Sequence, residues 1–511
     1  MADALTGLVD LMSPVTLLIV LVGTVVGMAI GAMPGLSATM GLALLVPFTF
    51  AMDPGPGLVL LGAFYMGAIY GGSFTAILVN APGTPSSIAT AFEGYRMTKQ
   101  GRSEEAIVAA TVASVVGGVV GVLFLIFLAP PLADFSLRFG PQEYFWVAMF
   151  GLTIIIGMST GSVLKGLIGG AFGILLGTVG ISPVGGDVRF TFGEPSLQGG
   201  VPLVPALIGL FTIPEVIKLI GRRSREFDVQ PNGKQEQRSA LQMAVDLVRN
   251  PRTVLKSSVI GSVIGILPGA GGSVANLVAY NEAKRTSKKP EEYGRGSAEG
   301  VVAAESANNA TVGGGFIPTL TLGVPGTPPD AIVLGVLLLQ GLRPGADLFT
   351  RSGDLVFTFA FALALSALMM APVGLIAGRA LQRGVVQVPA RYLAPGIAVL
   401  SLVGAFAIRS SFVDVVIMLV LGVIAYFLGR VGIGVAPIVL GLVLGPIAER
   451  GLVQGLLTST ELDLPWTSFF TRPLSIVLIL LTVAGFLLPL WQRRKQPVVE
   501  DMAAEAERDR A

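Results

Sequence analysis

Long apolar stretches separated by short charged segments form the main pattern along this chain. About 20 mostly apolar residues, each rising about 1.5 Å in a helix, cross the roughly 30 Å hydrocarbon layer of a membrane. Only helices or a closed barrel satisfy their backbone there, and runs this continuous exclude the alternating pattern of barrel strands. The pattern predicts an all-α polytopic membrane protein. The clearest runs are 106–133, 143–160, 354–378, 411–429 and 474–491.

Two Gly- and Pro-rich passages repeat the same motifs in the same order, which is unlikely by chance. The first passage runs through Pro34-Gly35, Ser37, Gly71-Gly72-Ser73 and Asn80-Ala81-Pro82-Gly83-Thr84-Pro85. The second runs through Pro268-Gly269, Ser273, Gly313-Gly314-Gly315 and Gly323-Val324-Pro325-Gly326-Thr327-Pro328. The chain is therefore expected to contain two structural repeats.

The Lys and Arg clusters predict how these repeats are oriented, because such clusters stay on the cytoplasmic side. Segment 253–281 lies between two clusters, and its first limb, Thr253–Leu267, would reach only about 22 Å as a helix. We expect a re-entrant hairpin with its tip at Pro268–Gly272, and an equivalent hairpin over 15–51 that enters from the outer side. Segments 57–95 and 298–345 would each cross once, in opposite directions, so the repeats are expected to be inverted.

The remaining apolar segments complete a topology of about 11 crossings plus two hairpins, with the N-terminus outside and the C-terminus inside. The apolar N-terminal run has no Lys/Arg segment before it, so we expect it to belong to the mature protein. The ordinary spans are expected at 106–130, 143–160, 162–181, 202–220, 352–378, 392–408, 411–429, 432–448 and 474–491. The domains are expected to be an N-terminal membrane repeat (1–220), a cytoplasmic linker (221–252), a C-terminal membrane repeat (253–491) and a charged cytoplasmic tail (492–511).

Composition narrows the possible functions. Charged residues make up 13% of the chain, against roughly 25% in soluble proteins. The absence of both Cys and His excludes disulfides, thiolate nucleophiles, Ser-His-Asp triads, haem and the usual zinc and copper sites. A Gly-x-Ser-x-Gly match around Ser159 closes an apolar helix and has no His to activate it, and no ATP-binding P-loop motif occurs. We therefore expect a protein that is not an enzyme and binds no cofactor.

The P-G-T-P motifs are expected to break helices inside the membrane, because Pro lacks an amide donor and Gly admits non-helical dihedrals. The freed N–H groups carry partial positive charge and suit a carboxylate, and freed carbonyls suit Na⁺. The alternative is that Ser, Thr and Asn only cap the broken helices while Gly permits close packing. The substrate-binding candidates are Ser37, Ser73, Asn80, Gly83, Thr84, Ser273, Asn276, Asn308, Asn309, Gly326 and Thr327. Backbone carbonyls near Pro34, Pro82, Pro268 and Pro325 are candidate Na⁺ ligands, and no other metal site is expected.

Ionisable residues within apolar segments are functional candidates by default, and Glu305 is the main candidate of this kind. It is followed by Asn308 and Asn309, and could bind a coupling cation, Na⁺, or carry H⁺. The alternative is that Glu299 and Glu305 both lie at the cytoplasmic interface near Arg295 and are simply solvated.

The motifs resemble those of the TctA family, the large membrane subunit of the tripartite tricarboxylate transporters, over roughly residues 15–450. They are G-A-M-P-G-L-S-A-T (31–39), Y-G-G-S-F-T-A-I-L-V-N-A-P-G-T-P (70–85), P-G-A-G-G-S-V-A-N (268–276), E-G-V-V-A-A-E-S-A-N-N-A-T-V-G-G (299–314) and L-G-V-P-G-T-P (322–328).

The resemblance implies a bacterial inner-membrane subunit that imports tricarboxylate-like carboxylates by cation-driven secondary transport. It also implies two partners, a small membrane subunit similar to TctB and a periplasmic solute-binding protein similar to TctC. A self-sufficient symporter without a binding protein is the alternative.

Overall fold

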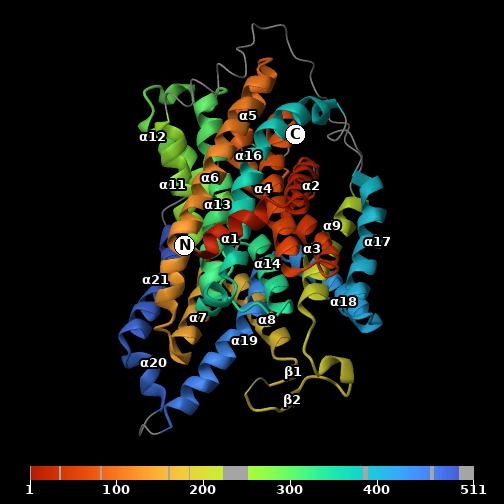
Figure 1. The fold of residues 1–511 in the computed structure, drawn as a ribbon, viewed down its shortest axis with the longest axis vertical. Coiled ribbons are helices and arrows are strands. Elements are labelled where there is room, and N and C mark those ends of the chain that lie inside the picture. Colours follow the sequence, from red (N-terminus) through yellow and green to blue (C-terminus); the bar gives the residue numbers. More distant parts are fainter. Residues whose placement is uncertain are drawn as a thin grey trace. The chain divides into compact units, whose positions relative to one another are not determined.

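The computed structural model describes residues 2–33, 36–80, 83–158, 162–182, 184–221, 251–383, 390–460 and 465–493. Apart from one short pair of strands, the regular structure in these ranges is helical, so the predicted all-α membrane fold is confirmed. The helices group into two compact units, shown in Figure 1. Unit 1 combines residues 1–138 with 194–430, and unit 2 combines 139–193 with 431–511.

The first half of unit 1 contains seven helical elements, and the starts of three of them follow local capping rules. Ser13 caps α2 by accepting a hydrogen bond from the Thr16 N–H, and Ser37 caps α3 by accepting one from Met40. Pro54 opens α4, where a missing N–H costs nothing. The elements are α1 (Ala2–Leu11), α2 (Pro14–Gly31), α3 (Ala38–Thr49), α4 (Pro54–Val79), η1 (Pro85–Ser87), α5 (Ile88–Lys99) and α6 (Ser103–Ser136).

The second half of unit 1 repeats the order of a helix pair followed by a broken helix. These elements are α11 (Arg252–Ile266), α12 (Gly271–Thr286), α13 (Ala298–Leu322) and α14 (Pro328–Leu339). The short turns η2 (Pro195–Leu197) and η3 (Pro290–Glu292) and the helices α9 (Leu203–Gly221), α15 (Ala346–Arg351), α16 (Gly353–Arg383), α17 (Ala390–Arg409) and α18 (Phe412–Arg430) complete the unit.

Helix ends fall at all four predicted interruptions, after Gly31, Val79, Ile266 and Leu322. Among the described residues, seven helices are long and apolar enough to span a membrane, or eight if one bent pair is counted as a span. Shorter apolar helices, such as α3 and α14, also occur. The total number of crossings, the re-entrant hairpins and the inverted orientation therefore stay predictions.

Glycines hold the first hairpin helix of each half directly against the broken helix. On α2, a Cβ at Gly27 or Gly31 would overlap the carbonyls of Phe64 and Ala68 on α4. On α11, a Cβ at Gly261 or Gly265 would overlap or crowd the carbonyls of Ala307 and Thr311 on α13. Figure 1 shows α2 beside α4 and α11 beside α13. The matched glycines are 234 residues apart in sequence and their contact partners are 243 residues apart, so each helix keeps its own offset and these contacts support the internal repeat.

Two of the clusters predicted to be cytoplasmic lie together in unit 1. Gln100 Nε2 donates to the carbonyl of Arg295 at 2.8 Å, and Arg102 Nη1 donates to that of Gly296 at 3.1 Å. The charged ends of α5 and α12 point to the same end of this unit in Figure 1. This arrangement agrees with the expectation that segments 93–105 and 281–299 face the same side of the membrane.

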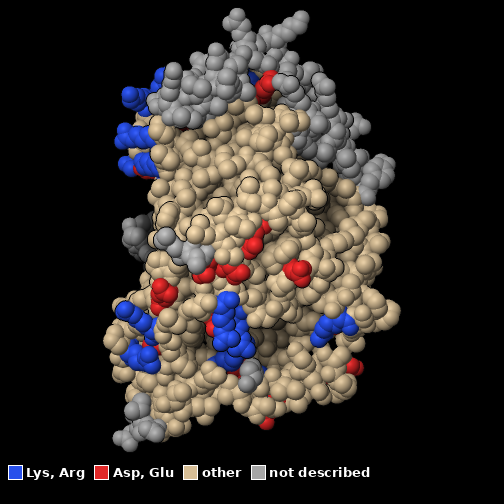
Figure 2. Space-filling model, in the orientation of Figure 1, with Lys and Arg blue, Asp and Glu red and all other residues tan. Residues whose placement is uncertain are grey.

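Large apolar side chains lie exposed along the outer faces of several helices. Phe127 is 69% exposed, Ile376 77% and Phe412 78%. Figure 2 shows a broad area of surface without charged side chains. Such an apolar surface is costly in water but suits contact with lipid.

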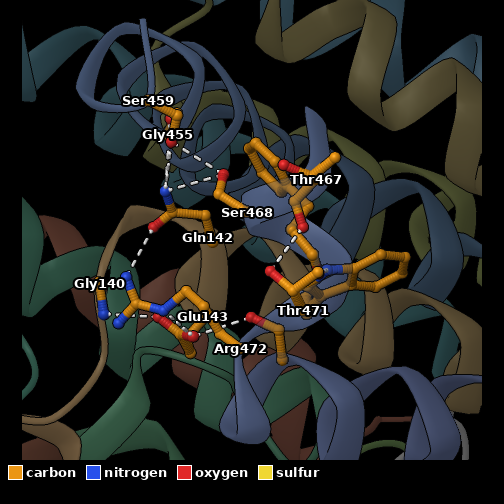
Figure 3. A network of polar contacts seen from close by, with 12 residues as sticks. Gly140, Gln142, Glu143, Gly455, Ser459, Thr467, Ser468, Thr471 and Arg472 are labelled. Atoms are coloured by element: carbon orange, nitrogen blue, oxygen red, sulfur yellow. Dashed lines mark hydrogen bonds and ion pairs between the residues drawn. The ribbon is translucent and has the colours of Figure 1, made fainter. Parts of the chain in front are cut away.

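Unit 2 is held by close glycine packing and by a network of polar contacts. A Cβ at Gly173 of α8 would overlap the carbonyl of Ile438 on α19. The buried Glu143 accepts from Arg472 Nε, Ser475 Oγ and the Gly140 N–H, each at 2.8 Å (Figure 3). The elements are α7 (Pro141–Met158), α8 (Val163–Gly177), the antiparallel pair β1 (Gly180–Ile181) and β2 (Val188–Arg189), α19 (Val435–Thr458), η5 (Pro465–Thr467), α20 (Ser468–Thr471) and α21 (Pro473–Arg493).

Candidate functional site

The two helix breaks have the same backbone geometry. Asn80 ends α4 in the left-handed conformation (φ 52°), and its N–H bonds the carbonyl of Thr75. Gly323 ends α13 in the same way (φ 69°), with its N–H on the carbonyl of Pro318. This conformation favours Gly and tolerates Asn, which explains the residue type at each position.

After each break the chain folds back onto the helix it has just left. A Cβ on Gly83 would stand 3.0 Å from Cα of Gly72, and a Cβ on Gly326 would stand 3.0 Å from Cα of Gly315. Thr84 and Thr327 then adopt extended conformations and begin the next helical segments. Gly83 and Gly326 are thus required for close backbone approach, as the packing alternative expected.

Polar groups from the two repeats meet at the tip of the second hairpin. Asn276 Nδ2 of α12 donates to the carbonyl of Ser86, just after the first break. Gly272 of α12 lies against both Ser86 and the Asn308 side chain of α13. We call Ser86, Asn276 and Asn308 the amide cluster.

The amide cluster retains unused hydrogen-bonding capacity. Oδ1 of Asn276 and both side-chain polar atoms of Asn308 are buried without a hydrogen-bond partner among the described residues. Asn309 also has an unpartnered Oδ1, while its Nδ2 donates to the carbonyl of Met66 at 3.3 Å. Buried polar groups are normally paired, so unused ones mark a place where a polar ligand or water gains bonds.

Other candidate residues make bonds of the capping kind. Ser37 caps α3, and Ser73 Oγ donates to the carbonyl of Tyr70 in its own helix at 2.7 Å. Thr84 shares hydrogen bonds with the hydroxyls of Ser86 and Ser87, both at 3.0 Å. Ser273 is half-buried in the first turn of α12.

The predicted Na⁺ ligands near prolines are placed only in part. Pro34 and Pro82 lie outside the described residues. Pro268 and Pro325 are described, and the glycine that follows each of them takes part in one hydrogen bond. The Gly269 N–H donates to the carbonyl of Gly326 at 2.6 Å, which joins the tip of the second hairpin to the second break. Within the described ranges, His, Cys, Asp and Glu form no group of three that could hold a metal ion.

Glu305 is fully buried, so the interpretation that it is solvated at the interface is wrong. Its carboxylate accepts hydrogen bonds from Thr90 of α5 and from Ser114 of α6, the latter at 3.2 Å. Glu299 does behave as that interpretation expected, since it is exposed and bonded to Thr253 and Ser287. Glu305 therefore joins the second repeat to two helices of the first.

Sequence reasoning missed Asp330, which follows the second P-G-T-P motif. It is fully buried in the first turn of α14, and its Oδ2 accepts from Thr327 Oγ1 at 2.6 Å. The Tyr65 hydroxyl lies 3.0 Å from the same Thr327 oxygen, and Asp330 Oδ1 has no partner. A comparison of the two repeats would have found it, because the position after the first motif that corresponds to Asp330 is the uncharged Ser87.

Sequence reasoning also missed Glu93, the first residue of the charged segment 93–105. The carboxylate is fully buried and accepts from Tyr280 at 2.6 Å, from Gly296 and Ser297 N–H groups at 2.8 Å, and from the Gly294 N–H. These donors all belong to the second repeat, whereas Glu93 lies on α5 in the first. The carboxylate thus fixes the two repeats to each other.

Comparisons with known proteins match almost the whole chain. A profile of the tripartite tricarboxylate transporter TctA family covers residues 17–440. An uncharacterised 52.8 kDa protein in the TAR-I ttuC' 3' region of Agrobacterium vitis is 36% identical over 480 residues, 94% of each chain. An uncharacterised protein in the TAR-II ttuC' 3' region of the same organism is 37% identical over 246 residues, 47% of this chain and 100% of that protein. The resemblance seen in the motifs is confirmed.

Proposed function

The chain belongs to the tripartite tricarboxylate transporter TctA family and is a multi-pass membrane subunit of that transporter class. From this premise we propose that it translocates carboxylates, tricarboxylate-like ones among them, in a secondary transporter that depends on a binding protein and on a coupling cation. The proposed partners are a TctB-like small membrane subunit and a TctC-like periplasmic solute-binding protein. The proposed location is the bacterial inner membrane, with the N-terminus periplasmic and the C-terminus cytoplasmic.

The observation that carries this proposal is the amide cluster. A carboxylate needs several hydrogen-bond donors, and Asn308 Nδ2 is a buried donor that makes no hydrogen bond of regular geometry, although the Asn308 side chain lies close enough to Glu305 to interact with its carboxylate. The cluster adjoins Gly271 and Gly272 at the start of the 16-residue helix α12, where backbone N–H groups favour negative charge. No Lys or Arg is needed to attract the substrate there.

Glu305 is proposed to act in coupling. It lies one helical turn from Asn308 and is held by hydroxyls of two other helices, so a change in its charge would act on three elements together. A buried carboxylate without a positive partner favours either a proton or a bound cation. Either would link substrate binding to an ion gradient.

Uptake by reconstituted protein tests the proposal. Proteoliposomes carrying the chain and its small subunit should accumulate labelled citrate or a dicarboxylate only when the binding protein and an inward cation gradient are both present. Asn80→Ala, Asn308→Ala and Asn309→Ala should each abolish uptake while the protein stays monodisperse. Ser401→Ala is the matched control, because the Ser401 hydroxyl bonds only a carbonyl of its own helix, α17, and should transport normally.

Three results would contradict parts of the proposal. Uptake that needs no binding protein would favour the self-sufficient symporter. Normal uptake by Asn308→Ala would remove the amide cluster from the substrate pathway, and normal uptake by Asn80→Ala or Asn309→Ala would remove that residue from it.

A further inference from the structure

Asp330 differs from the other fully buried acids of the described residues. Glu143 and Asp414 are paired with Arg472 and Arg409, at 2.8 and 2.5 Å. Glu93 accepts several N–H and O–H groups, and Glu305 accepts two hydroxyls. Asp330 alone among them keeps an oxygen, Oδ1, without a hydrogen-bond partner.

Among the residues that the structure describes, no positive side chain is paired with Asp330. The elements packed against α14 are α3, α4, α9 and α13. In sequence, α3 and α4 contain no charged residue, and α13 contains only the acids Glu299 and Glu305. On α9, Lys218 is half-exposed and paired with Glu215 at 2.7 Å. Tyr65 is the titratable group that faces Asp330, through Thr327.

Helix capping explains only part of this arrangement. Thr327 caps α14 by accepting the Asp330 N–H at 3.4 Å, and an acid in the first turn interacts well with the helix dipole. The contact with Thr327 therefore explains why Asp330 Oδ2 has a hydrogen-bond partner. It does not explain why Asp330 Oδ1 has none, or why an acidic side chain is buried at this position. The contrast with Glu143 in Figure 3, where three donors including a guanidinium surround the carboxylate, shows what a purely structural buried acid has in this protein.

We propose that Asp330, Thr327 and Tyr65 form a sodium-binding site at the second helix break, separate from Glu305. The site offers two carboxylate oxygens and two hydroxyl oxygens, the hard ligands that such a cation prefers. The Thr327 hydroxyl donates to Oδ2, so the carboxylate is the accepting end of the network.

The site occurs once, although the break occurs twice. At the first break Ser87 takes the place of Asp330 and shares a hydrogen bond with Thr84 at 3.0 Å. The same backbone there offers only neutral hydroxyls. The inference therefore assigns a single ion to the pair of breaks, and it rests on the proposed function in that the ion would be the coupling cation.

Thermal unfolding of the purified chain in detergent tests this site without transport. Melting temperature is measured against NaCl, with choline chloride keeping the ionic strength constant. Wild type should show a saturable rise of several degrees with Na⁺ and none with choline. Asp330→Asn and Thr327→Val should weaken the apparent affinity for Na⁺ at least tenfold, whereas Ser87→Ala, at the equivalent position of the first break, should keep the wild-type response.

Each alternative result has a defined meaning. A wild-type response in both site variants, or its loss only in Glu305→Gln, overturns the proposal. A shift that follows pH and not Na⁺ overturns it too, and assigns a proton to Asp330. If Asp330→Asn does not fold, Asp330→Ser, which copies the first break, and Thr327→Val decide the question.

Uptake assays separate this inference from the proposed function. Suppose that the melting temperature responds to Na⁺ through Asp330 but the chain and its partners transport no carboxylate. This result would support the sodium site and contradict the proposed function. Carboxylate uptake in a chain without any Na⁺ response rejects the site and retains the function.

Discussion

At the first helix break, Asn80 ends the helix and Thr84 shares a hydrogen bond with Ser87; at the second, Gly323 ends the helix and Thr327 donates to Asp330. The left-handed helix ends are matched, and so are the glycines that let the chain fold back. The side chains are not, because the second break carries a buried charge and the first does not. The two breaks thus share how their helices end and differ in the side chains that follow, and our proposals for the site rest on that difference.

The largest expected effect concerns how tightly each break is packed. A Cβ at Gly83 would overlap the carbonyl oxygen of Gly31, whereas at Gly326 it would stand 2.8 Å from that of Gly265. Gly83→Ala should cost about 3 kcal/mol or more and Gly326→Ala about 1 kcal/mol, since overpacking scales with the overlap. Melting temperature and the yield of monodisperse protein measure both. Equal losses would mean that the two breaks are packed alike. Gly55→Ala, which meets no atom within 4 Å, is the control.

The second effect concerns the joint between the repeats. Glu93 follows the first break, and the corresponding position after the second break is the apolar Val336. Glu93→Gln keeps the shape but removes the charge and one accepting oxygen, so it should cost about 2–3 kcal/mol. Thermal unfolding measures this loss, with the exposed Glu291→Gln as the control. If Glu93→Gln and Glu291→Gln have the same melting temperature, the Glu93 carboxylate does not fix the repeats to each other.

The third effect separates backbone from side chain at the first break. Asn80→Ala places a less tolerant residue in the left-handed conformation and should cost about 1 kcal/mol, whereas Asn80→Gly should not destabilise. Both should lose uptake if the Asn80 amide contacts the substrate. Gly323→Asn, which copies the first break into the second, should fold normally. Full uptake by Asn80→Gly would restrict Asn80 to a backbone role.

The smallest effect concerns the hairpins that precede the breaks. In the second, Lys256 of α11 and Glu282 of α12 form an ion pair at 2.5 Å, while 14–49 in the first contains no charged residue. Hydrogen bonds from Arg285, then Lys256, lower the pKa of Glu282 to about 2. Its stabilising contribution is therefore complete above the usual pKa of about 4.5 and lost as pH falls toward 2.

Glu282→Gln tests this contribution. The variant should melt slightly below wild type from pH 7 to about pH 5, and the difference should shrink at lower pH as Glu282 is protonated. A difference that does not change with pH would assign the effect to packing and not to charge. Glu292→Gln, which removes an exposed pair between near neighbours, is the control.

Periodicity and Pro-Gly placement predicted the helices and all four interruptions, because both depend on local rules. The spans expected at 106–130, 202–220 and 411–429 correspond to α6, α9 and α18. The expected end at 448 was too early, since α19 continues to Thr458 through a charged turn. Glu449 is accommodated there because Arg189 of β2 pairs with it at 2.8 Å, a contact far apart in sequence.

The candidate site was only partly predictable for the same reason. The motifs identified Asn276 and Asn308, but their meeting with Ser86 depends on how the repeats pack. Glu93 begins a charged segment, and its burial depends on donors from the second repeat that lie about 200 residues away in sequence. Asp330 was missed because the motif search compared only the residues that the two repeats share, and Asp330 stands at a position where they differ.

Unit 2 has a consequence for how the protein is made, because its two segments are far apart in the chain. Residues 139–193 leave the ribosome before residues 194–430 are synthesised, an interval on the order of 10–50 s at bacterial rates. During this time Glu143 has no Arg472, and Gly173 has no Ile438 to pack against. The early segment of unit 2 therefore depends on the insertion machinery, or on a chaperone, until α19 and α21 arrive.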